Sequence, residues 1–321
     1  MGSERSKLVD VVIVNWNTGV YLRDCLRSIA EADCTVLPVG NVVVVDNASS
    51  DDSASDLETP GLRVHVVRNA VNRGFAVACN QGARLCESDY LLFLNPDTRL
   101  FPDSLRSVGE FLRTETSRGV GICGARMVDE RGRPQISCSR FPTLRLFLGQ
   151  MTGLDRVLPA LFHPPHLRPE ELSRSGPVDQ VIGAFNLMRR SLFRDLGGFD
   201  ERYFLYFEDV DLALRAHRQG WPSYFLSDVR VFHAGNVSSS QVKGQRLHHW
   251  LCSRCEFAFR HMPRWEARLI VVLSLSAELA ARLTWAALRR SRSDFKDTAA
   301  GYKQFLQWLV QRRATRRTER G

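Results

Sequence analysis

Two aspartates follow apolar runs at positions where a carboxylate could bind a ligand. Asp46 comes after four consecutive valines, so its side chain should lie at the rim of a buried strand and could accept hydrogen bonds from ribose hydroxyls or a base edge. Asp97 closes another apolar run behind Asn95 and Pro96, and a divalent cation bound to a diphosphate prefers such hard oxygen ligands. A helix cap at Asp46 and an Asn-Pro-Asp turn at Asp97 are the plainer structural interpretations.

A third acidic segment could supply a general base. Glu208 and Asp209 lie between an aromatic run and an amphipathic helix, and of two adjacent carboxylates beside apolar rings one can have a raised proton affinity. Such a group suits the removal of a proton from a hydroxyl. The alternative is an acidic first helical turn, which explains Asp211 better than it explains the aromatic setting. His233 ends a further strand before a glycine, although a lone histidine is more often structural than a ligand.

Asn72, Arg73 and Gly74 open a predicted helix that begins near Phe75. The glycine permits close backbone approach, the helix N-terminus favours anions and Arg73 adds a positive charge. The segment could therefore bind phosphate, although an ordinary helix start explains it nearly as well.

Alternating apolar and amphipathic segments must position these residues. Short Val- and Leu-rich runs bounded by Asn, Asp and Gly are typical of buried parallel strands, and the alternation predicts βαβ units in an α/β fold with helices on both faces of the sheet. Ligands of such sheets bind beyond the carboxyl ends of the strands, where Asn15 and Trp16 also fall. The predicted strands cover residues 9–14, 42–45, 62–67 and 90–94, and the predicted helices cover 21–30, a short polar stretch near 51, 75–85 and 104–112.

The rest of the chain is less regular. Residues 139–178 are Pro-rich and predict an excursion or lid with short helices. Regular structure should resume at 178–189, followed by a helix over about 208–219, two short strands around Tyr224 and Val231, and helices to the end of the chain. We predict a catalytic domain over 1–240, which includes the 139–178 segment, and a helical extension over 241–321.

Positive charge is concentrated in the predicted extension. The chain carries a net charge of +9, and from Arg264 onward thirteen Lys and Arg face five Asp and Glu. Within the mostly apolar stretch 268–290, Glu278 and Arg282 are four residues apart and can pair on one helix face. This stretch is too polar for a clear membrane span and is better explained as an interfacial or packed amphipathic helix. A basic stripe at helical spacing follows at Arg312, Arg313, Arg316, Arg317 and Arg320.

The cysteines predict a reducing compartment. The eight cysteines are mostly scattered among apolar neighbours, which is typical of buried thiols rather than of disulfides. Cys252 and Cys255 could bind zinc if nearby histidines converged, but two small residues on one helix face are the simpler explanation. The polar residues 1–7 do not form a secretion signal. We therefore expect a cytoplasmic protein at the inner face of the cell membrane.

In this order, the motifs resemble those of family 2 glycosyltransferases with the A-type nucleotide-sugar fold (GT-A), and especially the rhamnosyltransferase-like branch. The resemblance covers roughly residues 8–237. The motifs that carry it include residues 11–17, 45–51, 72–75, 80–82, 94–97, 183–185, 197–201, 207–211 and Trp221.

The resemblance implies a metal-dependent, inverting transfer of one sugar from a nucleoside diphosphate donor, such as dTDP-rhamnose, to a glycan or polyprenyl-linked acceptor in cell-envelope or polysaccharide biosynthesis. Asp209 would be the base, with Glu208 beside it. Asp97 and His233 would bind Mg²⁺ or Mn²⁺, although Asn95 replaces the first aspartate of the family's Asp-x-Asp motif. Donor binding is assigned to Asn15, Trp16, Asp46, Asn72, Arg73, Gly74, Asn95 and Asp97. The acceptor side is assigned to Gly183, Ala184, Phe185 and the 139–178 excursion.

Other function classes fit the sequence less well. A nucleotidyltransferase should have a Gly-rich phosphate loop after its first strand, where this chain has Asn15 to Gly19. A non-catalytic nucleotide-sugar sensor or membrane scaffold should lack an intact Glu208 and Asp209. A nucleic-acid-binding protein should carry its positive charge on the core rather than in the tail. Peripheral membrane contact through the basic C-terminal helices is expected, and a homodimer is left open.

Overall fold

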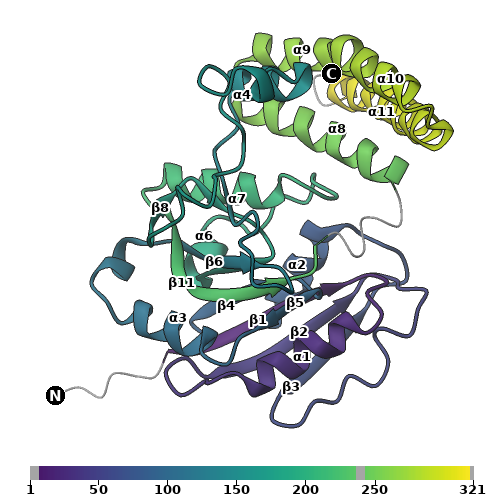
Figure 1. The fold of residues 1–321 in the computed structure, drawn as a ribbon. Helices are drawn as coiled ribbons and strands as arrows, with labels where there is room; N and C mark the ends of the chain where they lie inside the picture. Colours follow the sequence, from purple (N-terminus) through teal and green to yellow (C-terminus); the bar gives the residue numbers. More distant parts are fainter. Residues whose placement is uncertain (1–6, 236–242, 319–321) are drawn as a thin grey trace. The chain divides into compact units, whose positions relative to one another are not determined.

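The computed structural model describes residues 7–235 and 243–318, and the chain forms two compact units (Figure 1). Among the described residues, the first unit comprises 7–141, 166–201 and 208–235. The second comprises 142–165, 202–207 and 243–318. Each unit is described separately below.

A nine-stranded mixed sheet forms the centre of the first unit, in the order β3-β2-β1-β4-β10-β6-β11-β5, with β8 paired to β11. The hydrogen-bonding registers give β1, β2, β3, β4, β6 and β11 one direction and β5, β8 and β10 the opposite direction, so most strands are parallel as predicted. The strands are β1 (Val9–Asn15), β2 (Val39–Asp46), β3 (Arg63–Arg68), β4 (Tyr90–Leu94), β5 (Thr98–Leu100), β6 (Ile122–Val128), β8 (Gly176–Val178), β10 (Phe185–Arg189) and β11 (Ser223–His233).

Helices cover both faces of this sheet, because strand residues alternate between two apolar cores. In β1, Val11 and Ile13 join the core that includes α1 and α3, whereas Val12 and Val14 join the core that includes α2, α6 and α7. Each residue of β1 is buried, which explains the apolar run at residues 11–14. The helices are α1 (Tyr21–Glu31), α2 (Phe75–Ala83), α3 (Ser104–Leu112), the 3₁₀ turn η1 (Thr116–Gly119), α6 (Arg190–Asp195) and α7 (Glu208–Arg218).

Two local predictions are wrong. The stretch near Asp51 forms turns instead of a polar helix, because Asp51 accepts hydrogen bonds from the backbone N–H groups of Gly19 and Ser53. The two short strands expected around Tyr224 and Val231 are one strand, β11. A register shift between Leu226 and Arg230 interrupts its pairing with β6, and this irregularity gives the sequence the appearance of a break.

The second unit is helical. The 139–178 segment contains the short helices α4 (Leu144–Thr152) and α5 (Leu154–Val157). A small sheet of β7 (Cys138–Ser139) and β9 (Gln180–Val181) flanks this segment and belongs, like β8, to the first unit. The remaining elements are α8 (Lys243–His261), α9 (Arg264–Leu273), the π-helical turn η3 (Ser274–Glu278), α10 (Leu279–Leu288) and α11 (Arg292–Thr318).

The C-terminal basic stripe is described only in part. Arg312 donates to Glu256 at 2.8 Å and lies over the ring of Phe259 at 4.1 Å, so this member of the stripe is packed. The side chains of Arg313, Arg316 and Arg317, and the whole of Arg320, lie outside the described residues. By length and composition alone, the 25-residue stretch Arg264–Leu288 could cross a membrane.

Candidate functional site

The predicted metal ligands Asp97 and His233 lie side by side. Asp97 follows β4 and His233 ends β11, and the Ala234 N–H donates to the Asp97 carbonyl at 3.0 Å. The His233 Nε2 atom is 3.5 Å from Asp97 Oδ1, and the side chains are 15% and 8% exposed. This separation is too long for a good hydrogen bond and is close to the roughly 3 Å between adjacent ligands of a small cation with bonds of about 2.1 Å. The fold thus brings together two residues that are far apart in sequence, and their role as ligands stays a prediction.

A run of hydrogen bonds connects the end of β4 to Asp209. The Asn95 N–H donates to the Ala184 carbonyl at 3.1 Å, where β4 ends beside Phe185, the first residue of β10. The neighbouring Gly183 N–H donates to Asp209 Oδ2 at 3.0 Å. The segment predicted to line the acceptor side therefore contacts Asp209 through its backbone. Because Phe185 is buried in the core, its own side chain packs and does not face a ligand.

Gln180, which the sequence analysis did not single out, is a second donor to Asp209. Its Nε2 atom lies 2.9 Å from Asp209 Oδ2, and its side chain is buried. It comes from β9, the short strand that pairs with β7. The only signal in the sequence was its position three residues before Gly183.

Burial shifts the proton affinity of both carboxyl groups at the start of α7. Burial raises the pKa of Glu208 well above its usual range, and the negative charge of Asp209 raises it further. Burial also raises the pKa of Asp209, while hydrogen bonds from Val210, Gly183 and Gln180 act in the opposite direction. Glu208 Oε2 is buried with no hydrogen-bond partner among the described residues. Because the donors surround Asp209, the negative charge of the pair is better stabilised on Asp209.

Asp46 belongs to a polar cluster at the ends of β1 and β2. Its Oδ1 atom accepts from Asn15 Nδ2 at 2.9 Å and from Ser49 Oγ at 2.6 Å. Asn15 is fully buried and also donates to Ser53 Oγ at 2.9 Å, so it orients Asp46. The partly exposed Trp16 follows directly. Since β1 lies between β2 and β4, the ends that carry Asp46 and Asp97 are two strand spacings apart, or roughly 10 Å.

Asn47 fixes the predicted phosphate-binding segment. Its amide donates to Asn72 Oδ1 at 2.9 Å and to the Gly74 carbonyl at 3.2 Å, and its oxygen accepts from the Arg73 N–H at 3.0 Å. Gly74 has φ 86° and ψ 166° at the start of α2, a conformation that essentially requires glycine. The Arg73 side chain is exposed. The segment is therefore held beside the Asp46 cluster at the carboxyl edge of the sheet.

Asp211 has a structural role. It is fully buried and pairs with Arg215 at 2.7 Å, and Arg215 donates to the carbonyls of Leu196 and Gly198 at 2.8 and 2.9 Å. Asn80 holds the same loop by donating to the Phe199 carbonyl at 2.9 Å and accepting from its N–H. These contacts explain two motifs of the sequence without a catalytic role.

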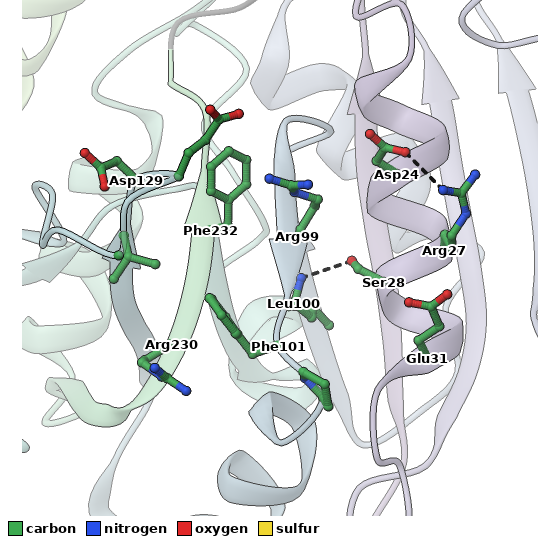
Figure 2. A pocket seen from close by; sticks show the side chains of 14 residues that line it. Asp24, Arg27, Ser28, Glu31, Arg99, Leu100, Phe101, Asp129, Arg230 and Phe232 are labelled. Carbon is green, nitrogen blue, oxygen red and sulfur yellow. Dashed lines mark hydrogen bonds and ion pairs between the residues drawn. The ribbon is translucent and has the colours of Figure 1, made fainter.

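A cavity of about 700 Å³ lies between α1, β5 and β11 (Figure 2). Arg99 lies 4.1 Å from the Phe232 ring centroid, and Asp24 pairs with Arg27 at 3.5 Å. None of the predicted site residues lines this cavity. Its positive and negative side chains are mixed, so it has no marked preference for a charged ligand.

The donor atoms at Asp97 and His233 fit a divalent cation that completes its shell with diphosphate oxygens. Within residues 7–235 and 243–318, no group of three or more His, Cys, Asp or Glu side chains could hold a metal by itself. Cys252 lies 3.4 Å from His248 Nδ1 on α8, but burial raises the pKa of the Cys255 thiol to about 12 and disfavours the thiolate that zinc requires.

Comparisons with known proteins identify the family of the chain. Residues 6–265 match the model of the family described as glycosyltransferase like family 2. The chain is 31% identical over 301 residues to the N-acetylglucosaminyl-diphospho-decaprenol L-rhamnosyltransferase of Mycobacterium tuberculosis, covering 89% of this chain and 95% of the relative. It is also 31% identical over 166 residues to rhamnosyltransferase WbbL of Escherichia coli, covering 51% of this chain and 58% of the relative.

Solved structures confirm the GT-A fold. The mannosyltransferase PcManGT of Pyrobaculum calidifontis, in complex with GDP-Man and Mn²⁺, has a TM-score of 0.53 at 19% identity, covering 93% of this chain and 86% of that chain. TarS 1-349 of S. aureus, in complex with UDP-GlcNAc, has a TM-score of 0.54 at 18% identity, covering 93% and 80%. At these identities the likeness concerns the fold alone.

Proposed function

Because the chain belongs to glycosyltransferase family 2, as the family match over residues 6–265 shows, we propose that it transfers one sugar, with inversion, from a nucleoside diphosphate donor to a polyprenyl-linked acceptor in cell-envelope biosynthesis. The observation that carries this proposal is the single run of contacts from Asp209 through Gly183, Ala184 and Asn95 to the Asp97-His233 pair. It supports a base and a diphosphate site on one edge of one sheet.

The donor nucleotide is assigned to the edge formed by β1, β2 and the start of α2. Asp46, oriented by Asn15 and Ser49, would accept ribose or base hydrogen bonds beside Trp16. The exposed Arg73 at a helix N-terminus would contact phosphate. Asp97 and His233 would hold Mg²⁺ or Mn²⁺, and a cation bound there would stabilise the charge that develops on the departing diphosphate.

Asp209 is assigned as the general base. Its Oδ2 atom is fixed by Gln180 and Gly183, which leaves the carboxylate oriented rather than rotating freely. It would take the proton of the acceptor hydroxyl as that oxygen attacks the anomeric carbon from the face opposite the diphosphate, so configuration inverts. A neutral Glu208 would not compete for this proton.

The acceptor and donor are proposed from the relatives. The relatives of about 31% identity named above are rhamnosyltransferases, and the one from Mycobacterium tuberculosis is named for an N-acetylglucosaminyl-diphospho-decaprenol acceptor. We therefore assign dTDP-rhamnose as the donor and a polyprenyl-diphosphate-linked sugar at the inner face of the cell membrane as the acceptor.

The test uses the purified full chain with a panel of sugar nucleotides. Thermal stabilisation is measured with and without Mn²⁺ or Mg²⁺, and transfer is measured to a short-chain N-acetylglucosaminyl-diphospho-lipid. Asp97→Ala should lose the metal-dependent part of the stabilisation, whereas Asp209→Asn should bind the donor but not transfer. Asp195→Asn, which changes an exposed acid at the end of α6, is the matched control. Full transfer by Asp209→Asn would refute the assignment of the base.

A further inference from the structure

The segment formed by α9, η3 and α10 carries large exposed apolar residues. Trp265, Val272, Trp285 and Leu288 are 60%, 59%, 54% and 74% exposed. Residues 265, 268, 272, 276, 280, 284 and 288, three or four apart, are all exposed, so they follow one side of the helical segment. Singly exposed apolar residues are common, but three large ones along one side, with the exposed Trp285 next to them, are not. We call this side the outer face.

The charges around the outer face have one sign. Arg264 and Arg268 are exposed at its beginning, and Arg289, Arg290 and Arg292 are exposed at and just beyond its end. Between residues 264 and 292 no carboxylate belongs to an exposed residue: Glu266 is half-buried and Glu278 is buried. Tryptophans near both ends with flanking arginines are typical of segments that lie at the boundary between lipid and water.

The inner side of the same segment carries a buried ion pair. Glu278 lies in the π-helical turn η3 and pairs with Arg254 of α8, which is 2% exposed, and with Arg282 at 2.9 Å. Arg254 also donates to Ser274 Oγ at 2.8 Å, and the Tyr302 hydroxyl of α11 donates to the Ser274 carbonyl at 2.9 Å. These contacts attach the middle of the segment to α8 and α11.

The two sides together argue against a helix that spans the membrane. The stretch Arg264–Leu288 is long and apolar enough to span a bilayer. Crossing would either take the Arg254-Glu278 pair into hydrocarbon together with α8 or separate the pair and leave a charge without its partner. A segment lying in the interface keeps the ion pair within the helical unit and places only the outer face against lipid.

We propose that the outer face of α9, η3 and α10 docks this chain onto an anionic phospholipid bilayer, with the segment lying parallel to the surface and not crossing it. The arginines contact the phosphate headgroups, and Trp265 and Trp285 enter the interface. The inference rests on the proposed lipid-linked acceptor for its biological purpose, but its physical basis is independent of the sugar transferred.

Vesicle co-sedimentation tests the docking. The full chain is mixed with vesicles of phosphatidylcholine alone or with one-third phosphatidylglycerol, at low and high salt. Binding should need the anionic lipid and weaken with salt. Trp265→Ser with Trp285→Ser, and Arg268→Glu with Arg289→Glu, should each weaken binding by roughly tenfold or more. Leu85→Ser and Arg113→Glu, exposed positions of the first unit, should bind as the unchanged chain does. Equal binding by all variants would overturn the proposal.

Alkaline carbonate extraction of cell membranes decides between lying and crossing. If the segment lies on the surface, carbonate should release the chain into the wash. Retention of the chain in the pellet would overturn the parallel orientation. Transfer to a water-soluble, short-chain acceptor separates this inference from the proposed function. The two double variants should keep that activity, so loss of vesicle binding with intact transfer supports docking. If the unchanged chain does not transfer sugar to this acceptor, the result counts against the proposed function alone.

Discussion

Replacing Gln180 with leucine should move the pH dependence of sugar transfer to higher pH. The Gln180 amide donates to Asp209 Oδ2 at 2.9 Å and lowers the pKa of that carboxyl group, against the effect of burial. Leucine removes this donor, so the pKa of Asp209 should rise. A hydrogen bond to a charged group contributes roughly 1.5–3 kcal/mol, and about 1.4 kcal/mol corresponds to one pH unit, so the expected shift is about 1 to 2 units.

The Gly183 and Val210 N–H groups still donate to Asp209 in this variant, which favours the lower end of that range. A general base must be ionised, so the acid limb of kcat/KM should move upward by about one pH unit. On that limb the rate should fall about tenfold, while the high-pH plateau should stay nearly unchanged.

The assay is kcat/KM against pH for the unchanged chain, Gln180→Leu and Gln180→Met, with thermal unfolding followed at each pH. Methionine is a second side chain of similar length without the donor, so both variants should show the same shift. A variant that only folds poorly would lose activity at every pH. An unmoved acid limb in two well-folded variants would refute the conclusion that Gln180 tunes the base.

Further predictions concern Glu208, His233 and Gly74. Glu208→Gln should retain transfer within a factor of about 3, because the structure favours a neutral Glu208, whereas loss on the scale of a general base, roughly 100-fold or more, would make Glu208 the base. Since the folded-state pKa of Glu208 is raised, unfolding free energy should fall as pH rises from its ordinary value of 4.5 toward the raised pKa, and urea unfolding of Glu208→Gln should lack this fall. His233→Ala should lose Mn²⁺-dependent stabilisation by nucleoside diphosphate but keep metal-free nucleotide binding, which calorimetry can separate; unchanged Mn²⁺ dependence would count against a metal ligand at this position. Gly74→Ala should lower the free energy of unfolding in urea by about 1–3 kcal/mol and raise the KM for the donor, because alanine is strained at φ 86°. An unchanged free energy of unfolding would show that the turn adapts to alanine.

The parts of the site that follow from strand direction could be predicted from the sequence. Asp46, Asp97 and His233 each come at or just after the end of an apolar strand, and parallel strands bring their carboxyl ends to one edge. The apolar runs were therefore sufficient to place these residues at one edge of the sheet, whereas the contact between Asp97 and His233 also depends on β5, in which Thr98 pairs with His233. The same argument placed the start of α2 with Gly74, because βα loops begin at that edge.

Residues on short or irregular elements could not be predicted in this way. Gln180 is on a two-residue strand, and no periodic pattern can arise over two residues. The long strand β11 was divided in two because its register shift places polar residues, such as Asp228, where a regular strand would continue its pattern. Asn47 resembles any polar loop residue in sequence, and only the fold shows that it bonds to Asn72, Arg73 and Gly74.

The backbone just before the proposed base is held by packing rather than by its own preference. Tyr206 and Phe207 have φ values of 71° and 68°, which are costly for residues with bulky side chains. Phe207 packs against Trp250 and Phe257 of α8, with ring centroids 5.1 and 5.5 Å apart. Glu208 begins α7 directly after this pair, so the strained backbone immediately precedes the helix that carries the proposed base.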